Sequence, residues 1–209
     1  MIHQVLPRSC RSVRRGECLT NCACVWRAQP RYKAFTLIEL VLVVGIIIVL
    51  AGLVLSTVGY ARKKGARARA ETEIAALSAA CENYKADNGI YPQEASSTDT
   101  LDPKMSGDPS AYQSASLYLY KQLSGDSAAN RNPTGKSYMV FKPNMLFPAD
   151  QSQNVQYIQD PFGFSYGYST ANQVDSTKGY NPTFDLWTTC TLTNSPPSAA
   201  DQNQWIKNW

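Results

Sequence analysis

One long apolar segment near the N-terminus dominates the sequence. From Leu40 to Leu55 no side chain is charged or polar, and in the wider stretch 37–58 only three of 22 residues are polar. As an α-helix, 22 residues span about 33 Å, close to the ~30 Å hydrocarbon core of a bilayer. A helix or strand buried in a soluble core usually shows a polar face at this length, and the apolar part of a cleaved signal peptide is shorter. The pattern therefore favours a membrane-spanning helix over both alternatives.

Charge is distributed unevenly around this segment. The chain carries 20 Lys+Arg and 16 Asp+Glu, a net charge of +4. Residues 1–33 carry +6, residues 34–70 carry +4 and residues 71–209 carry −6. The basic residues thus flank the apolar segment, and the acidic C-terminal part disfavours nucleic acid as a partner. The two flanks predict opposite membrane orientations; because the N-terminal group is larger and comes first, we expect residues 61–209 to lie outside the cytoplasm.

The sequence offers little for catalysis. Histidine occurs once, at His3, which rules out a Ser-His-Asp triad or a multi-histidine zinc site. The cluster Cys18-x3-Cys22-x-Cys24 lacks the four regularly spaced ligands of a zinc site. No phosphate-binding loop or nucleophile elbow occurs. A carboxylate pair acting as acid and base stays open as an alternative, but Asp160 and Asp185 are expected in a turn and a strand. The chain is therefore predicted not to be an enzyme.

A lone acid marks the start of the apolar segment, in the sequence KAFTLIELVLVV at residues 33–44. An ionisable group at the edge of a membrane helix costs free energy, so Glu39 is a functional hypothesis. These residues resemble the class III signal of type IV pilins and type II secretion pseudopilins. The resemblance implies that a prepilin peptidase removes leader 1–34 by cutting between Ala34 and Phe35, and that Phe35 is then N-methylated. It also implies an inner-membrane subunit that forms a helical homopolymer, with an assembly platform and minor pseudopilins as further partners.

A physical role for Glu39 follows from that cleavage. The new α-amino group at Phe35 would be largely cationic, since its ordinary pKa is about 7.7–8.0. In a filament it can meet the Glu39 carboxylate of a neighbouring subunit. Opposite charges attract far more strongly in a low-dielectric setting than in water, and pairing removes the cost of an unpaired buried charge. We therefore expect Glu39 to set the axial register of assembly.

The apolar segment is expected to continue as one helix from Phe35 to Asn88, with a membrane half at 35–60 and an amphipathic half at 61–88. The pairs Arg67/Glu71 and Arg69/Glu73 have the i,i+4 spacing that supports a helix. An apolar stripe with 3–4 spacing consists of Ile74, Leu77, Cys81 and Tyr84. Asn88-Gly89 predicts the helix end. Many relatives carry a helix-disturbing proline where this chain has Ser56.

Residues 89–209 change character and are rich in Ser, Thr, Asn, Gln and aromatic residues. The patterns predict a short helix at Ser114–Leu123 and strands at Lys136–Lys142, Val155–Gln159, Phe164–Ser169 and Thr183–Thr189. We therefore expect an α+β, pilin-like fold, with a long N-terminal α-helix packed on a small antiparallel β-sheet head. Three phrases, DPFG-FSYGY at 160–168, FDLW at 184–187 and the ending WIKNW, resemble the head of the major pseudopilin of type II secretion.

The same resemblance implies a Ca²⁺ site between the last strand and the C-terminus. Calcium takes six to eight oxygen ligands, several of them carboxylates, and between Trp187 and Trp205 this chain has only Asp201. Asp201 is thus the one candidate ligand, and no cofactor is predicted to be required. A disulfide between Cys81 and Cys190, the cysteines of the mature chain, would suit an oxidising periplasm and is an alternative to two separate thiols.

Taken together, these patterns predict a structural subunit of a periplasmic pseudopilus or pilus, most consistent with type II protein secretion. A permanently anchored periplasmic binding module and a type IV pilin for adhesion or DNA uptake are the alternatives.

Overall fold

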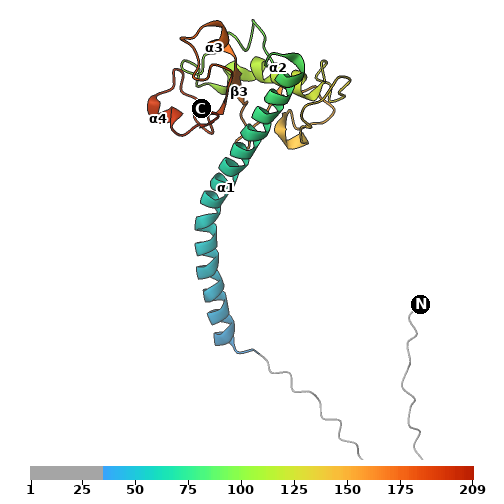
Figure 1. Cartoon of the computed structure of the whole chain (residues 1–209). Helices are drawn as coiled ribbons and strands as arrows, with labels where there is room; N and C mark the ends of the chain where they lie inside the picture. Colours follow the sequence, from blue (N-terminus) through green and yellow to red (C-terminus); the bar gives the residue numbers. More distant parts are fainter. Residues whose placement is uncertain (1–34) are drawn as a thin grey trace, which may run out of the picture. The chain divides into compact units, whose positions relative to one another are not determined.

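The computed structural model describes residues 35–209, so leader 1–34 with Ala34 lies outside the described residues. The chain divides into two compact units, residues 1–48 and 49–209. The described part of the first unit, residues 35–48, forms the beginning of helix α1 (Leu37–Asn88). This helix is the longest element of the chain (Figure 1). It is helical through Ser56, as expected for a position that carries no proline.

Helix α1 ends where the sequence predicts. The Gly89 amide donates to the carbonyl of Lys85 at 2.7 Å, and Gly89 has φ +79°. This left-handed conformation suits glycine because it has no Cβ. The Asn88 side chain closes the last turn by donating to the Tyr84 carbonyl at 2.8 Å.

The remaining elements are short and belong to residues 89–209. The helical ones are η1 (Pro109–Tyr112), α2 (Gln113–Ser124), η2 (Pro143–Met145), α3 (Ala171–Val174) and α4 (Ala199–Gln202). The strands are β1 (Leu146–Phe147), β2 (Tyr157–Ile158), β3 (Gly167–Ser169), β4 (Asp185–Thr188) and β5 (Ile206–Lys207). The helix predicted at Ser114–Leu123 is therefore confirmed as α2.

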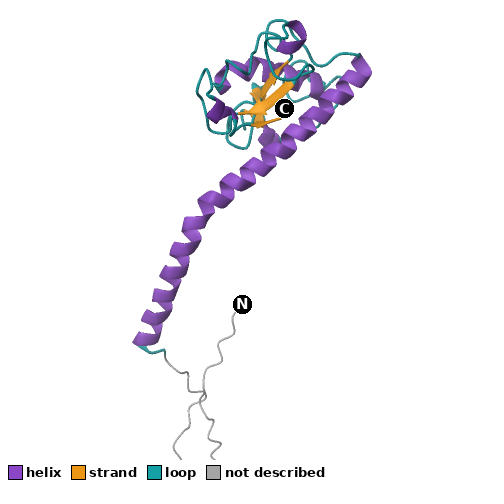
Figure 2. Ribbon diagram, turned by 60° about the vertical axis from the view of Figure 1, so that its left-hand side comes forward, coloured by secondary structure: helices purple, strands orange, loops and turns teal. Residues whose placement is uncertain are grey.

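Within residues 35–209 the strand pairs are antiparallel and form two sheets. Strands β1 and β2 form one sheet, and the second has the order β3-β4-β5. In the second sheet Gly167 pairs with Trp187, and Thr188 pairs with Ile206. The strands lie beside α2 and the C-terminal half of α1 (Figure 2). The predicted α+β fold with a small antiparallel head is confirmed.

The core joins the amphipathic half of α1 to this head. Ile74, Leu77 and Cys81 of the predicted stripe are buried, whereas Tyr84 is half-buried. They share one cluster with residues of α2 and the sheets, among them Leu119, Leu123, Ile158, Tyr168 and Leu186. Burying an aliphatic side chain contributes roughly 1.5–3 kcal/mol. The stripe therefore holds the head against the helix.

One predicted strand is wrong. Residues 136–142 form no strand, because the amides of Tyr138 and Met139 both donate to the carbonyl of Leu123 at the end of α2. The aromatic rings of this segment pack on helices instead: Tyr138 contacts Tyr84 edge-on, and Phe141 contacts Tyr120. The other three predicted strands are confirmed as β2, β3 and β4, each shorter than predicted.

Replacing Gly167 with alanine is expected to destabilise the head. A Cβ at this position would lie 2.2 Å from the buried Trp187 ring, and overpacking of this kind costs roughly 1–3 kcal/mol. Urea unfolding of the full chain in detergent, followed by tryptophan fluorescence, measures the loss. The matched control is Gly65→Ala, where the Cβ meets nothing within 4 Å and a mid-helix alanine should add up to about 1 kcal/mol. Equal effects of the two substitutions would contradict the packing argument.

Candidate functional site

The first turn of α1 holds the residues predicted to matter for assembly. Phe35 precedes the helix and is 77% exposed. Glu39 lies in the first turn, where the positive end of the helix dipole favours an acid. Its backbone amide donates to the Thr36 hydroxyl at 3.3 Å. Thr36 therefore fixes the helix start. Thr36 is not among the residues predicted above, although the Thr-x-x-Glu spacing of a capping box indicates it.

The apolar half of α1 is not covered by the described chain. From residue 35 to residue 55 every side chain is exposed, and the large apolar ones are 45–82% exposed. Within residues 35–209 one helix, α1, is long and apolar enough to cross a membrane. A soluble protein rarely exposes so large a contiguous apolar surface. This segment is therefore not a buried core helix, and a membrane or other subunits must cover it.

Both ion pairs predicted after the membrane half are present. The Arg67 Nε lies 3.5 Å from Glu71 Oε1, and the Arg69 Nε lies 2.6 Å from Glu73 Oε1. The second pair is tied into the head, because the Tyr166 hydroxyl donates to Glu73 Oε2 at 2.8 Å. The Glu73 side chain is only 11% exposed. This contact joins α1 to the segment before β3.

The DPFG sequence forms a tight chain reversal around a buried carboxylate. Asp160 Oδ1 accepts hydrogen bonds from the amides of Phe162 and Phe164 at 2.9 and 2.8 Å. The Thr188 hydroxyl of β4 donates to Asp160 Oδ2. Burial raises the pKa of Asp160 to about 6, although these donors oppose the shift. The hydrogen bonds to this carboxylate come from its own chain reversal and from β4, which gives Asp160 a structural rather than a catalytic role.

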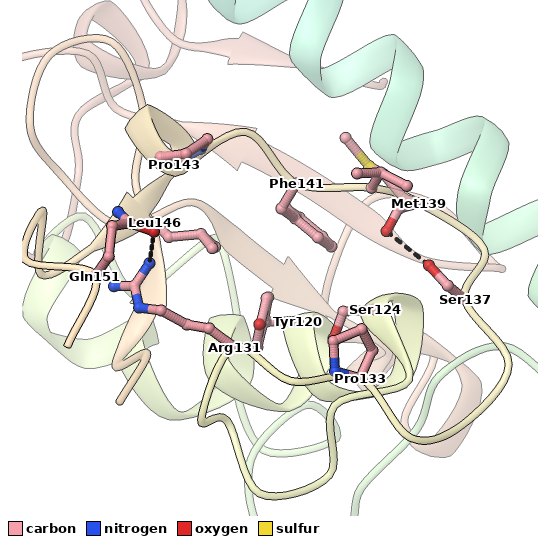
Figure 3. Close-up of a pocket in the computed structure, with 11 residues that line it drawn as sticks. Tyr120, Ser124, Arg131, Pro133, Ser137, Met139, Phe141, Pro143, Leu146 and Gln151 are labelled. Atoms are coloured by element: carbon pink, nitrogen blue, oxygen red, sulfur yellow. Dashed lines mark hydrogen bonds between the residues drawn. The ribbon is translucent and has the colours of Figure 1, made fainter. Parts of the chain in front are cut away.

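A cavity of about 210 Å³ lies in the head between α2 and residues 131–151 (Figure 3). The Arg131 guanidinium at its edge donates to the carbonyls of Gln153 and Pro148 and to the Gln151 side chain. All three acceptors are protein atoms, so this arginine holds the loop in place. With its one lining cation engaged by the protein itself, the cavity gives no support to the binding-module alternative.

Comparison with known proteins decides the family. A family model described as type II secretion system (T2SS), protein G, matches residues 57–143. The type II secretion system core protein G of Aeromonas hydrophila is 30% identical over 58% of this chain and 81% of that protein. The chain belongs to the type II secretion system protein G family. The core protein G of Pseudomonas aeruginosa is 32% identical, covering 58% of this chain and 82% of the relative. That of Escherichia coli (strain K12) is 31% identical, covering 56% and 77%. No solved structure matches the chain.

Membership in the protein G family confirms the resemblance to major pseudopilins. The family comprises structural components of a secretion system rather than enzymes. Together with the one candidate membrane helix, it fits a protein anchored in the inner membrane.

Asp201, the candidate calcium ligand of this protein G homologue, accepts hydrogen bonds from nearby residues of the chain. It lies in α4, where its carboxylate accepts from the Ser198 amide and hydroxyl at 3.0 and 2.8 Å and from Asn194 Nδ2 at 3.1 Å. These contacts lower its pKa. Among residues 35–209 no group of three or more Asp, Glu, His or Cys side chains could hold a metal ion. The Asp201 carboxylate is therefore engaged by its own loop, and its role as a calcium ligand stays a prediction.

The two cysteines of the described chain are separate free thiols, so the bridge between Cys81 and Cys190 is not formed in the structure. Cys81 is fully buried on α1, and burial raises the pKa of its thiol. The Cys190 thiol donates to the Gln204 carbonyl at 3.6 Å. The two sulfur atoms thus lie in different parts of the structure, and neither thiol is a reactive thiolate.

Asp160 is expected to make the head less stable as pH rises. Its pKa is about 6 in the folded chain against 3.8 for the ordinary group, so the folded state binds more protons between these values. The contribution of the protonated Asp160 carboxyl to the free energy of unfolding is fully present below pH 3.8 and is lost as pH rises through 6. Urea unfolding gives the free energy of unfolding at pH 4 and at pH 7. Between these pH values it should fall further for wild type than for Asp160→Asn, by roughly 1–3 kcal/mol. Parallel pH profiles of the two proteins would refute this assignment.

Proposed function

We propose that the chain is a structural subunit of a periplasmic pseudopilus that serves type II protein secretion. Prepilin peptidase cuts between Ala34 and Phe35 on the cytoplasmic side of the membrane, and Phe35 is N-methylated. An inner-membrane assembly platform then extracts the subunit into a helical homopolymer, together with minor pseudopilins. The observation that carries this proposal is the uncovered apolar half of α1 with Glu39 in its first turn, in a member of the protein G family.

The geometry supports an assembling subunit for a physical reason. An apolar helix can leave a bilayer only if another apolar environment replaces the lipid, and identical helices packed side by side provide one. In such a bundle the Glu39 carboxylate would be unpaired without a cation. The α-amino group of a neighbouring Phe35 is a cation at the same end of the helix, and pairing satisfies both charges.

The test is the intact mass and N-terminal sequence of the protein recovered from membranes. A chain that starts at N-methylated Phe35 is the expected result. The variant Ala34→Gly, which carries the residue that the family usually has before the cut, controls for peptidase activity in the same cells. Wild type that keeps its leader while Ala34→Gly loses it would overturn the proposal, and would leave a permanently anchored protein.

A further inference from the structure

A second cavity, of about 220 Å³, lies where the head meets α1, within the unit of residues 49–209. Two cationic side chains of α1, Lys63 and Arg67, form one wall. The other walls come from Phe162 of the DPFG reversal, from the loop Cys190–Leu192 after β4, and from Gln204. A water molecule takes about 30 Å³ of liquid, so the cavity has room for several waters or for one small polar group. Neither the fold nor the assembly role explains it.

The position of this cavity along α1 relates it to the membrane surface. The apolar segment ends at Val58 on the same helix. At about 1.5 Å per residue, Lys63 lies roughly 7.5 Å beyond Val58 and Arg67 roughly 13 Å beyond it. The headgroup layer on each side of a bilayer is about 5–8 Å thick. Tyr60, which is 71% exposed, has the place of an interfacial aromatic residue. Lys63 therefore lies at the outer edge of the headgroup layer and Arg67 just beyond it, so the cavity faces the surface of the bilayer.

The charges of the cavity favour an anion. Within residues 35–209 the Lys63 ammonium forms no ion pair. Arg67 is held in place, because its Nη1 donates to the Gln204 carbonyl at 2.8 Å and its Nε lies 3.5 Å from Glu71 Oε1. Two acids lie near these cations: Glu71, whose side chain is 57% exposed on the next turn, and the buried Asp160, whose carboxylate is hydrogen-bonded within the head. Both cations line the cavity and neither acid does, so the walls themselves are positive.

The walls opposite the cations are partly apolar. Phe162 and Leu192 are both partly buried and line the cavity. A phosphate ester combines an anion with an attached apolar body, which matches cations on one side and apolar side chains on the other. Arginine and lysine both bind phosphate oxygens, arginine through its planar fork and lysine as a point charge.

We propose that this cavity binds the headgroup phosphate of an anionic membrane phospholipid between Lys63 and Arg67, and so seats the head on the bilayer before assembly. The proposal depends on the membrane helix and not on filament formation. It also accounts for a feature that the positive-inside rule leaves unexplained, namely a basic group on the head side of the membrane segment.

The test is native mass spectrometry of the full chain, released from mixed micelles that contain phosphatidylglycerol and phosphatidylcholine in equal amounts. Wild type is expected to retain one phosphatidylglycerol in preference to phosphatidylcholine. Lys63→Gln/Arg67→Gln should lower that preference about tenfold. The matched control is Arg62→Gln/Lys64→Gln, which removes the same charge from the same turns but no side chain that lines the cavity. This control should stay within about twofold of wild type. Tryptophan fluorescence verifies that both variants are folded.

Each other outcome overturns the proposal. Equal losses in the two double variants would mean that the basic group attracts lipid through diffuse charge and that the cavity binds nothing specific. No loss in either would mean that lipid is not the ligand. Displacement of the lipid by about 10 mM inorganic phosphate would identify a free anion as the ligand. Unchanged lipid retention with fewer filaments for Lys63→Gln/Arg67→Gln would assign these cations to a contact between subunits. A wild type that keeps its lipid but never assembles would instead refute the proposed function alone.

Discussion

Replacing Glu39 with glutamine is expected to lower pseudopilus assembly at least tenfold while leaving the amount of subunit in the membrane unchanged. Glutamine keeps the size of the side chain and removes the charge. If the carboxylate pairs with the α-amino group of a neighbouring Phe35, the substitution leaves that cation unpaired in an apolar bundle, which costs several kcal/mol per contact. The monomer should lose little stability, since Glu39 is exposed in the first turn of α1 and the residues that hold this helix against the head lie further along it.

Filaments sheared from cells and quantified against membrane-bound subunit give the measurement. Glu39→Asp keeps the charge on a shorter side chain and should restore a large part of assembly. Glu82→Gln serves as the matched control, because Glu82 is an exposed acid on the same helix beyond the apolar segment. Assembly of Glu39→Gln within twofold of wild type would refute the charge-pairing role and favour a permanently anchored module.

The long helix could be predicted almost completely from the sequence. Its apolar run, its i,i+4 pairs and its 3–4 stripe are local patterns, and the Asn88-Gly89 end is a local signal too. Such patterns are read correctly because each depends on residues within one or two turns of the helix. The helix continues without a break through Ser56, because no proline at this position interrupts the hydrogen bonds of the backbone.

The strands of the head were harder to predict because they are two to four residues long. Strands β1 and β5 were missed, since two residues cannot display an alternating pattern. Residues 136–142 display that pattern without being a strand. The apolar positions of the pattern, Tyr138 and Phe141, pack on tyrosines of α1 and α2. The backbone amides of Tyr138 and Met139 donate to a carbonyl at the end of α2. The choice between sheet and helix as a packing partner is a tertiary effect.

The candidate site was predictable only in part. Glu39 stands out because an acid in an apolar run is costly, yet the role of Thr36 became clear only from its hydrogen bond. The cavity around Lys63 and Arg67 combines α1 with Phe162, with residues 190–192 and with Gln204, which lie far along the chain from the two cations. No local pattern connects such residues. Similarly, Asp201 stands out in the sequence as the one carboxylate between Trp187 and Trp205, and only the structure shows that it caps α4.

The largest effect on stability is expected for Leu77→Ala. Leu77 is fully buried in the cluster that joins α1 to the sheets and α2. Truncating a leucine in such a place removes apolar contact and leaves a cavity, which costs roughly 2–5 kcal/mol. Urea unfolding of the full chain in detergent, followed by the fluorescence of the buried Trp187 and Trp205, should show a midpoint lower by about 1–2 M.

The matched control is Val140→Ala, which also removes methyl groups but from a side chain that is 87% exposed. It should change stability by less than about 0.5 kcal/mol. A loss below 1 kcal/mol for Leu77→Ala would mean that the head folds without the helix and that α1 is only a tether. A loss in the expected range would mean that the head is stable only as part of the helix. Movement of α1 along a filament axis would then carry the head with it as one body, which is the mechanical property that an assembling subunit needs.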